Sequence, residues 1–130
     1  MSGPWSDYAS VFLQVVGIGS LVLLAIPLVV APLAWARVLR WDAPVDADLT
    51  VYFGRCLGAV IGVLAVAALF AAGNTAVQPF SFGIVIASFA LMVIVHAWGA
   101  LRGIQPRTES LETVAWLLLL VVAVLSFPGG

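Results

Sequence analysis

The sequence predicts an all-α membrane protein, an antiparallel four-helix transmembrane bundle with both termini outside. Of its 130 residues, 64% are hydrophobic and only 8% are charged, whereas soluble domains carry about 25% charged residues. The mean hydropathy is +1.20. Long stretches without charge alternate with short polar connectors. We therefore expect one transmembrane domain over residues 1–130, with helices at about 8–36, 50–72, 80–101 and 109–127.

The first charge-free stretch lies between Asp7 and Arg37. A bilayer core of ~30 Å needs about 20 helical residues, so this stretch can cross with tilt. Pro27 and Pro32 fall in its second half, and each removes a backbone hydrogen bond. We expect a kink or a loosened turn there.

A connector with most of the chain's charge follows this helix, and Trp35 and Trp41 are expected to flank it as interfacial anchors. The connector contains Arg37, Arg40, Asp42, Pro44, Asp46 and Asp48.

A second charge-free window runs from Cys56 to Leu101 and is long enough for two crossings. Gly73-Asn74-Thr75 and Gln78-Pro79 interrupt it, which indicates a short turn between two helices. Cys56 is the only cysteine, so an internal disulfide and a CxxC motif are both excluded.

The last helix follows a connector with Arg102 and Arg107. Thr108 is expected to cap it, and Glu109 and Glu112 to lie in its first turn, where carboxylates meet the positive end of the helix dipole. All arginines lie in the first and third connectors or at the adjacent end of the second helix. By the positive-inside rule these connectors are cytoplasmic.

Three glycines at every fourth residue, Gly54, Gly58 and Gly62, form a helix-packing stripe in the second span. Such small residues let another helix backbone approach closely within the membrane. The partner helix can belong to the same chain or to another one, and the sequence leaves both alternatives open.

Four ionisable residues are candidates for binding a ligand or a proton: Arg55, His96, Glu109 and Glu112. If the helices run up and down, they lie near the cytoplasmic end and can form a polar vestibule. The simpler interpretation is a belt of ion pairs in which Glu112 satisfies Arg55, because charges within a span need partners. His96 is the only histidine, and one histidine is thin support for a metal or haem site, so no metal site is expected.

In size and topology the chain resembles small bacterial four-span membrane proteins such as the DoxX-like group. The residues that carry the resemblance are the Arg-x-x-Gly step Arg55-Cys56-Leu57-Gly58. The resemblance implies a layout of four spans and no particular site residue.

The leading functional hypothesis is a small accessory or structural subunit of the bacterial inner membrane, because the sequence holds no catalytic motif. It would pack against copies of itself or other membrane subunits. One alternative is an oligomeric transporter or channel for a small solute or ion, with Gln14, Ser20, Ser88 and His96 along its path. Another is a lipid-, quinone- or haem-binding protein or enzyme that uses the Arg/His/Glu cluster. The net charge of -1 shows no excess of basic residues of the kind that binds nucleic acid.

Overall fold

The computed structural model describes residues 2–42 and 47–129, and all regular secondary structure in them is helical. Pro44 and Asp46 of the expected first connector lie outside the described residues. Four helices are long and apolar enough to cross a membrane: Ser6–Val30, Asp48–Ala72, Gln78–Arg102 and Arg107–Leu125. The prediction of an all-α, multi-pass membrane protein is confirmed to this extent.

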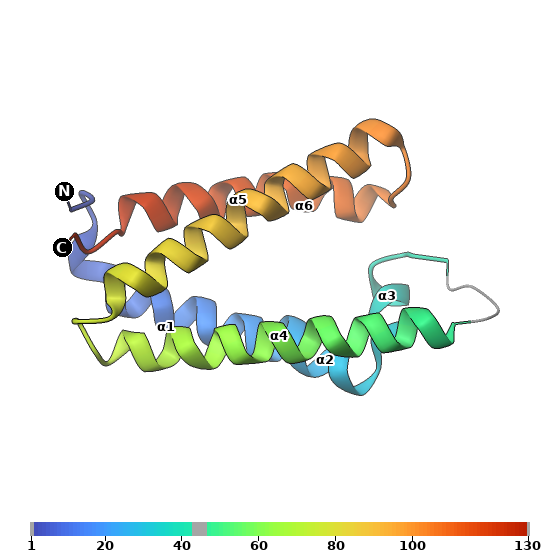
Figure 1. Cartoon of the computed structure of the whole chain (residues 1–130). Coiled ribbons are helices and arrows are strands. Elements are labelled where there is room, and N and C mark those ends of the chain that lie inside the picture. The colour runs from blue at the N-terminus through green and yellow to red at the C-terminus, as the bar shows by residue number, and fades with distance from the viewer. Residues whose placement is uncertain (1, 43–46, 130) are drawn as a thin grey trace.

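The elements are arranged in two pairs of long helices (Figure 1). The first span packs along α4, and α5 packs along α6. In chain order the elements are η1 (Ser6–Tyr8), α1 (Ala9–Ser20), η2 (Leu21–Ala25), α2 (Ile26–Val30), α3 (Pro32–Val38), α4 (Asp48–Ala72), α5 (Gln78–Arg102) and α6 (Arg107–Leu125).

The two pairs meet at the end of the molecule that holds both chain termini and diverge toward the other end (Figure 1). At the joined end the backbone N–H groups of Gly3 and Trp5 donate to the carbonyls of Phe127 and Leu125, at 2.8 and 2.9 Å. We call the opposite end, where the two pairs diverge, the splayed end.

Aromatic packing holds the joined end together. The Phe82 ring, fully buried, stacks on Phe12 at 5.4 Å between centroids and meets Phe127 edge-on at 6.0 Å. The Gln78 side chain donates to Ser10 Oγ at 2.8 Å and so ties the start of α5 to α1. The buried core takes residues from all four spans, with Ala68 of α4 and Ala123 of α6 beside Phe12 and Phe82.

The first span is irregular around its prolines, as the sequence predicts. Residues Leu21–Ala25 form a π-helical turn, with the Ile26 N–H bonded to the Leu21 carbonyl. Pro27 follows directly, and a widened turn is a common way to absorb the ring and the missing donor. Ala31 leaves the helix entirely, with φ -144° and ψ 63°, because a residue before proline avoids the helical region. The expected continuous helix to about residue 36 is therefore broken at Ala31.

The stripe of Gly54, Gly58 and Gly62 on α4 faces the first span of the same chain. A Cβ at Gly58 would lie 2.9 Å from the Ala25 carbonyl oxygen, and one at Gly54 would lie 2.7 Å from the Pro32 side chain. A Cβ at Gly62 would meet its nearest atom at 3.7 Å. Gly58 and Gly54 thus permit a close approach that a larger residue would prevent.

Gly103 ends α5 in the left-handed conformation, with φ +64°. Its N–H and that of Ile104 bond back to the carbonyls of Ala100 and Gly99, which is the arrangement of a Schellman cap. A side chain there costs backbone energy although the space around it is open.

We expect Gly103→Ala to lower the free energy of unfolding by about 1 kcal/mol, because L-residues avoid this conformation. Denaturation in mixed micelles with increasing SDS measures the change. Gly83→Ala is the matched control: Gly83 is helical and has open space at its Cβ position. It should stabilise the helix by about 0.5–1 kcal/mol. Equal effects of the two variants would contradict the assignment of Gly103 as a left-handed cap.

Candidate functional site

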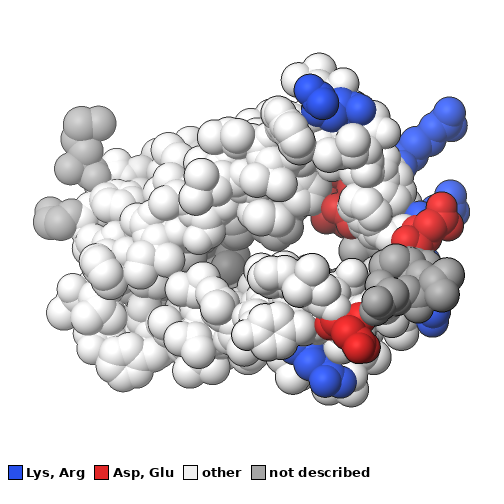
Figure 2. Space-filling view, turned by 45° about the vertical axis from the view of Figure 1, so that its right-hand side comes forward, with Lys and Arg blue, Asp and Glu red and all other residues white. Residues whose placement is uncertain are grey.

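A cavity of about 580 Å³ lies between the two helix pairs. The space-filling view shows the hollow between the helix pairs beside the end where the charged side chains gather (Figure 2). Most of its wall is aliphatic and aromatic, including Val16, Leu24, Leu57, Leu64, Val85 and Phe89. Its polar end is made by His96, Glu109 and Glu112, which we call the His–Glu–Glu cluster.

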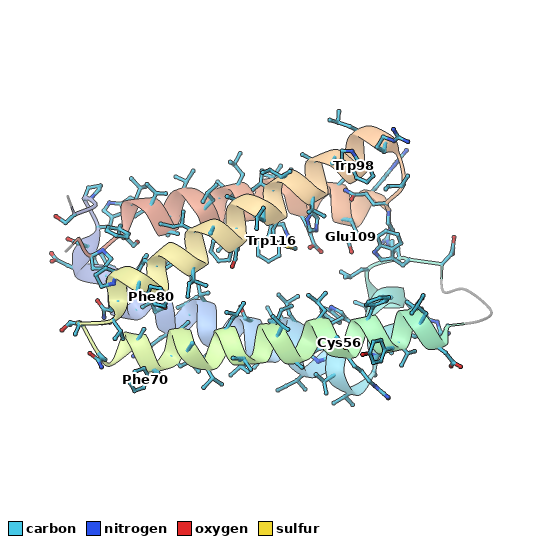
Figure 3. The ribbon with its side chains drawn as sticks, in the orientation of Figure 1. Cys56, Phe70, Phe80, Trp98, Glu109 and Trp116 are labelled. Carbon is cyan, nitrogen blue, oxygen red and sulfur yellow. The ribbon has the colours of Figure 1, made fainter. Side chains whose placement is uncertain are left out.

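The cluster comes from facing positions on α5 and α6. His96 is buried, with its Nε2 3.1 Å from Glu109 Oε2 and 3.7 Å from Glu112 Oε2. The Glu109 side chain is 13% exposed and that of Glu112 is 33% exposed. The two glutamates are three residues apart on one helix, so they share a face. Glu109 points from α6 toward the space between the pairs (Figure 3).

The hydrogen bonds of His96 decide which of its nitrogens carries a proton. Nδ1 lies 2.9 Å from the Met92 carbonyl oxygen, and a carbonyl can only accept, so Nδ1 carries the hydrogen. In a neutral ring Nε2 then has a lone pair. That lone pair faces two carboxylate oxygens. The cluster therefore needs a proton, a hydrogen-bond donor or a cation among its three acceptor atoms.

Trp41 reaches the cluster from the first connector. Its indole Nε1–H donates to Glu109 Oε1 at 2.7 Å. Arg40 makes this possible by taking a left-handed conformation, with φ 66°, so that the Trp41 N–H bonds back to the Ala36 carbonyl and caps α3. The sequence identified Trp41 only as an interfacial anchor.

Thr108 makes a second contact across the splayed end. Its hydroxyl donates to the Leu39 carbonyl, while the N-cap of α6 is Pro106. The expectation that Thr108 caps the last helix is therefore wrong, because its hydroxyl is used by the connector. Together, Thr108 and Trp41 attach the connector after α3 to the start of α6.

Gln105 fixes the turn between α5 and α6, a role that the sequence did not reveal. Its side-chain amide donates to the His96 carbonyl at 3.0 Å. The side chain also lies against Gly99, where any Cβ would collide with it. Gln105 and Gly99 thus hold the cluster's two helices at a fixed separation.

Trp116 forms part of the cavity wall next to the cluster. Its ring centroid lies 6.0 Å from that of His96 and 5.6 Å from that of Phe89. Figure 3 shows it pointing from α6 toward the other helix pair. It is therefore placed to contact both an apolar body and a polar head of a bound molecule.

Arg55 does not join the other candidates. It is exposed on α4, and the described residues contain no ion pair between it and Glu112. Glu112 instead faces His96, whose Nε2 lies 3.7 Å from Glu112 Oε2. Arg102 lies over the Trp98 ring, 5.7 Å from its centroid. The expected Arg55–Glu112 pair fails because α4 and α6 belong to different helix pairs, which diverge at this end (Figure 1).

The residues expected along a transport path are divided. Ser20, Ser88 and His96 contribute to the cavity wall, whereas Gln14 is exposed on the outer surface of the first span. Ser88 lies about two helical turns from His96 on α5, and Ser20 lies on α1 in the first span.

Comparison with protein-family models, with curated protein sequences and with solved structures gave no match.

Proposed function

We propose that this small membrane protein binds an amphipathic molecule of the lipid or quinone class within the bilayer. The apolar body would occupy the cavity between the helix pairs, and the polar head would contact the His–Glu–Glu cluster. The observation that supports this is the continuity between an apolar cavity of about 580 Å³ and the buried His96 at its end. Ligand pockets typically combine an apolar wall with a few converging polar groups.

The cluster's chemistry favours a head group that donates hydrogen bonds. The carboxylates of Glu109 and Glu112 accept only when ionised, and the neutral His96 offers a lone pair at Nε2. A hydroxyl head, such as that of a quinol, can satisfy these acceptors. Haem is less well supported, because Nε2, which would bind the iron, already faces Glu109 at 3.1 Å.

We further propose that the chain is an antiparallel bundle in the bacterial inner membrane, with both termini outside. The arginines support this orientation because positive charge favours the cytoplasmic side. The charged side chains of the visible face gather at the splayed end (Figure 2). The head of a bound molecule would then lie near the cytoplasmic surface.

The accessory-subunit hypothesis loses one of its supports. A glycine stripe could have packed against other subunits, but Gly58 lies against the first span and Gly54 against Pro32 of the same chain. Apolar side chains on the outer surface are expected of any protein that faces lipid. They do not argue for a partner subunit.

The test compares two phenylalanine substitutions on neighbouring residues of α5. Ser88→Phe places a ring in the cavity, because Ser88 lines it. Ala87→Phe adds the same ring at an exposed position. Each protein is extracted gently from the producing membrane, and native mass spectrometry and lipid extraction identify what is bound.

We expect the original protein and Ala87→Phe to retain the same defined amphiphile and Ser88→Phe to lose it at least tenfold. Equal retention by all three proteins would contradict binding in the cavity. Isolation of a larger protein complex without any bound small molecule would instead favour the accessory-subunit hypothesis.

A further inference from the structure

We propose that the His–Glu–Glu cluster binds one divalent transition-metal ion of the zinc type. The three ligand atoms are His96 Nε2, Glu109 Oε2 and Glu112 Oε2. One ligand atom from each of the three residues lies within 4.8 Å of the other two. Atoms bound to zinc at about 2.0–2.2 Å in a tetrahedron are roughly 3.3–3.6 Å apart. The observed separations from His96, 3.1 and 3.7 Å, are close to this range.

Outer hydrogen bonds orient two of these ligands as a metal site requires. His96 donates its Nδ1–H to the Met92 carbonyl, which directs Nε2 toward the glutamates. Glu109 accepts the Trp41 indole N–H on Oε1, which leaves Oε2 facing His96. Histidine ligands usually donate the second ring nitrogen to a carbonyl or carboxylate, and ligating carboxylates are themselves hydrogen-bonded. In His96 and Glu109, the atoms left without outer partners are the two that face each other.

Charge also favours a divalent ion. If both glutamates are ionised beside a neutral histidine, the cluster carries a charge of -2, and the exposed Arg55 does not compensate it. Charge is expensive near the apolar membrane interior unless it is paired. An ion of charge +2 makes the cluster neutral, whereas a single proton on His96 leaves it at -1.

The ligand types select the ion. Imidazole suits zinc and other late transition metals, whereas magnesium and calcium prefer a shell of oxygen ligands alone. Three protein ligands leave a further position for water or another molecule. Because all three residues line the cavity, a hydroxyl head of the proposed amphiphile could bind there. The metal proposal is nevertheless independent of that function and is tested with the metal alone.

The test uses the whole chain, purified in detergent without a histidine tag and stripped with a chelator. Equilibrium dialysis against Zn²⁺, followed by elemental analysis, gives the amount bound. We expect one zinc per chain, and at least tenfold weaker binding in Glu109→Gln and Glu112→Gln, since loss of even an outer partner costs about 10–100-fold. Asp7→Asn removes an exposed carboxylate before α1 and should bind as the original protein does.

A second measurement separates lost binding from lost folding. Zinc should raise the Tm of the original protein and of Asp7→Asn, but not that of Glu112→Gln. Glu112 is the most exposed of the three ligands, so its substitution is the one best tolerated. Absence of bound zinc in the original protein would overturn the proposal, and so would glutamine variants that both bind zinc as tightly as the original protein does. Loss of zinc binding with retention of the amphiphile would leave the proposed function intact.

Discussion

Gly58→Leu is expected to push the first span away from α4 and to lower the free energy of unfolding strongly in mild detergent. Any side chain at residue 58 begins 2.9 Å from the Ala25 carbonyl oxygen, from Leu28 Cβ and from Val29 Cγ2. The carbonyl is backbone and cannot rotate away, so the helices must move apart. Overpacking usually costs about 1–3 kcal/mol, and leucine adds a whole branched side chain at this contact. We therefore expect a loss above about 3 kcal/mol in SDS denaturation.

The same glycine stripe offers a graded control. Gly62→Ala places its Cβ 3.7 Å from the nearest atom, which is ordinary van der Waals contact. It should be neutral, or more stable by about 0.5–1 kcal/mol, because alanine favours the helix. Gly58→Ala should lie between the two variants. If Gly58→Leu were as stable as Gly62→Ala, the close contact of α4 with the first span would be wrong.

The membrane class of the fold could be predicted because it depends on composition and the spacing of charges. Four apolar helices follow from stretches without charge that end at polar connectors, and the structure has four such helices. The effect of Pro27 and Pro32 was also predictable, since a missing N–H acts locally. The sequence did not show that the widened turn would lie before Pro27 and that the chain would leave the helix at Ala31.

The candidate site was predictable only where its residues are close in the chain. His96 and Glu109 are joined by one short turn, so their proximity follows from a simple helix pair. Trp41 comes from a connector far away in sequence, and its contact depends on how α3 lies across the splayed end. Arg55 was grouped with the cluster only because of its expected depth in the membrane. Depth does not determine which helices are neighbours, and α4 diverges from α6 here (Figure 1).

His96→Ala is the second substitution with a large expected effect, because it removes the imidazole that faces the carboxylates of Glu109 and Glu112. Glu109 keeps the Trp41 hydrogen bond, but Glu112 loses the imidazole 3.7 Å away, which pairs with it when a proton lies on His96. Breaking a buried pair costs about 3–5 kcal/mol, and partial exposure of Glu112 reduces this. We expect a loss of about 2–3 kcal/mol in the free energy of unfolding at neutral pH.

The double variant His96→Ala/Glu112→Gln distinguishes this charge effect from a simple loss of packing. Removing one carboxylate relieves the repulsion, so the double variant should be more stable than His96→Ala alone. Glu112→Gln by itself should cost less than His96→Ala, since His96 can still pair with Glu109. A double-mutant cycle in SDS denaturation measures the coupling between the two sites. If the two losses in the free energy of unfolding simply added, the stabilising effect of His96 would come from the packing of its imidazole beside Trp116. Glu112 would then contribute to ligand binding and not to stability.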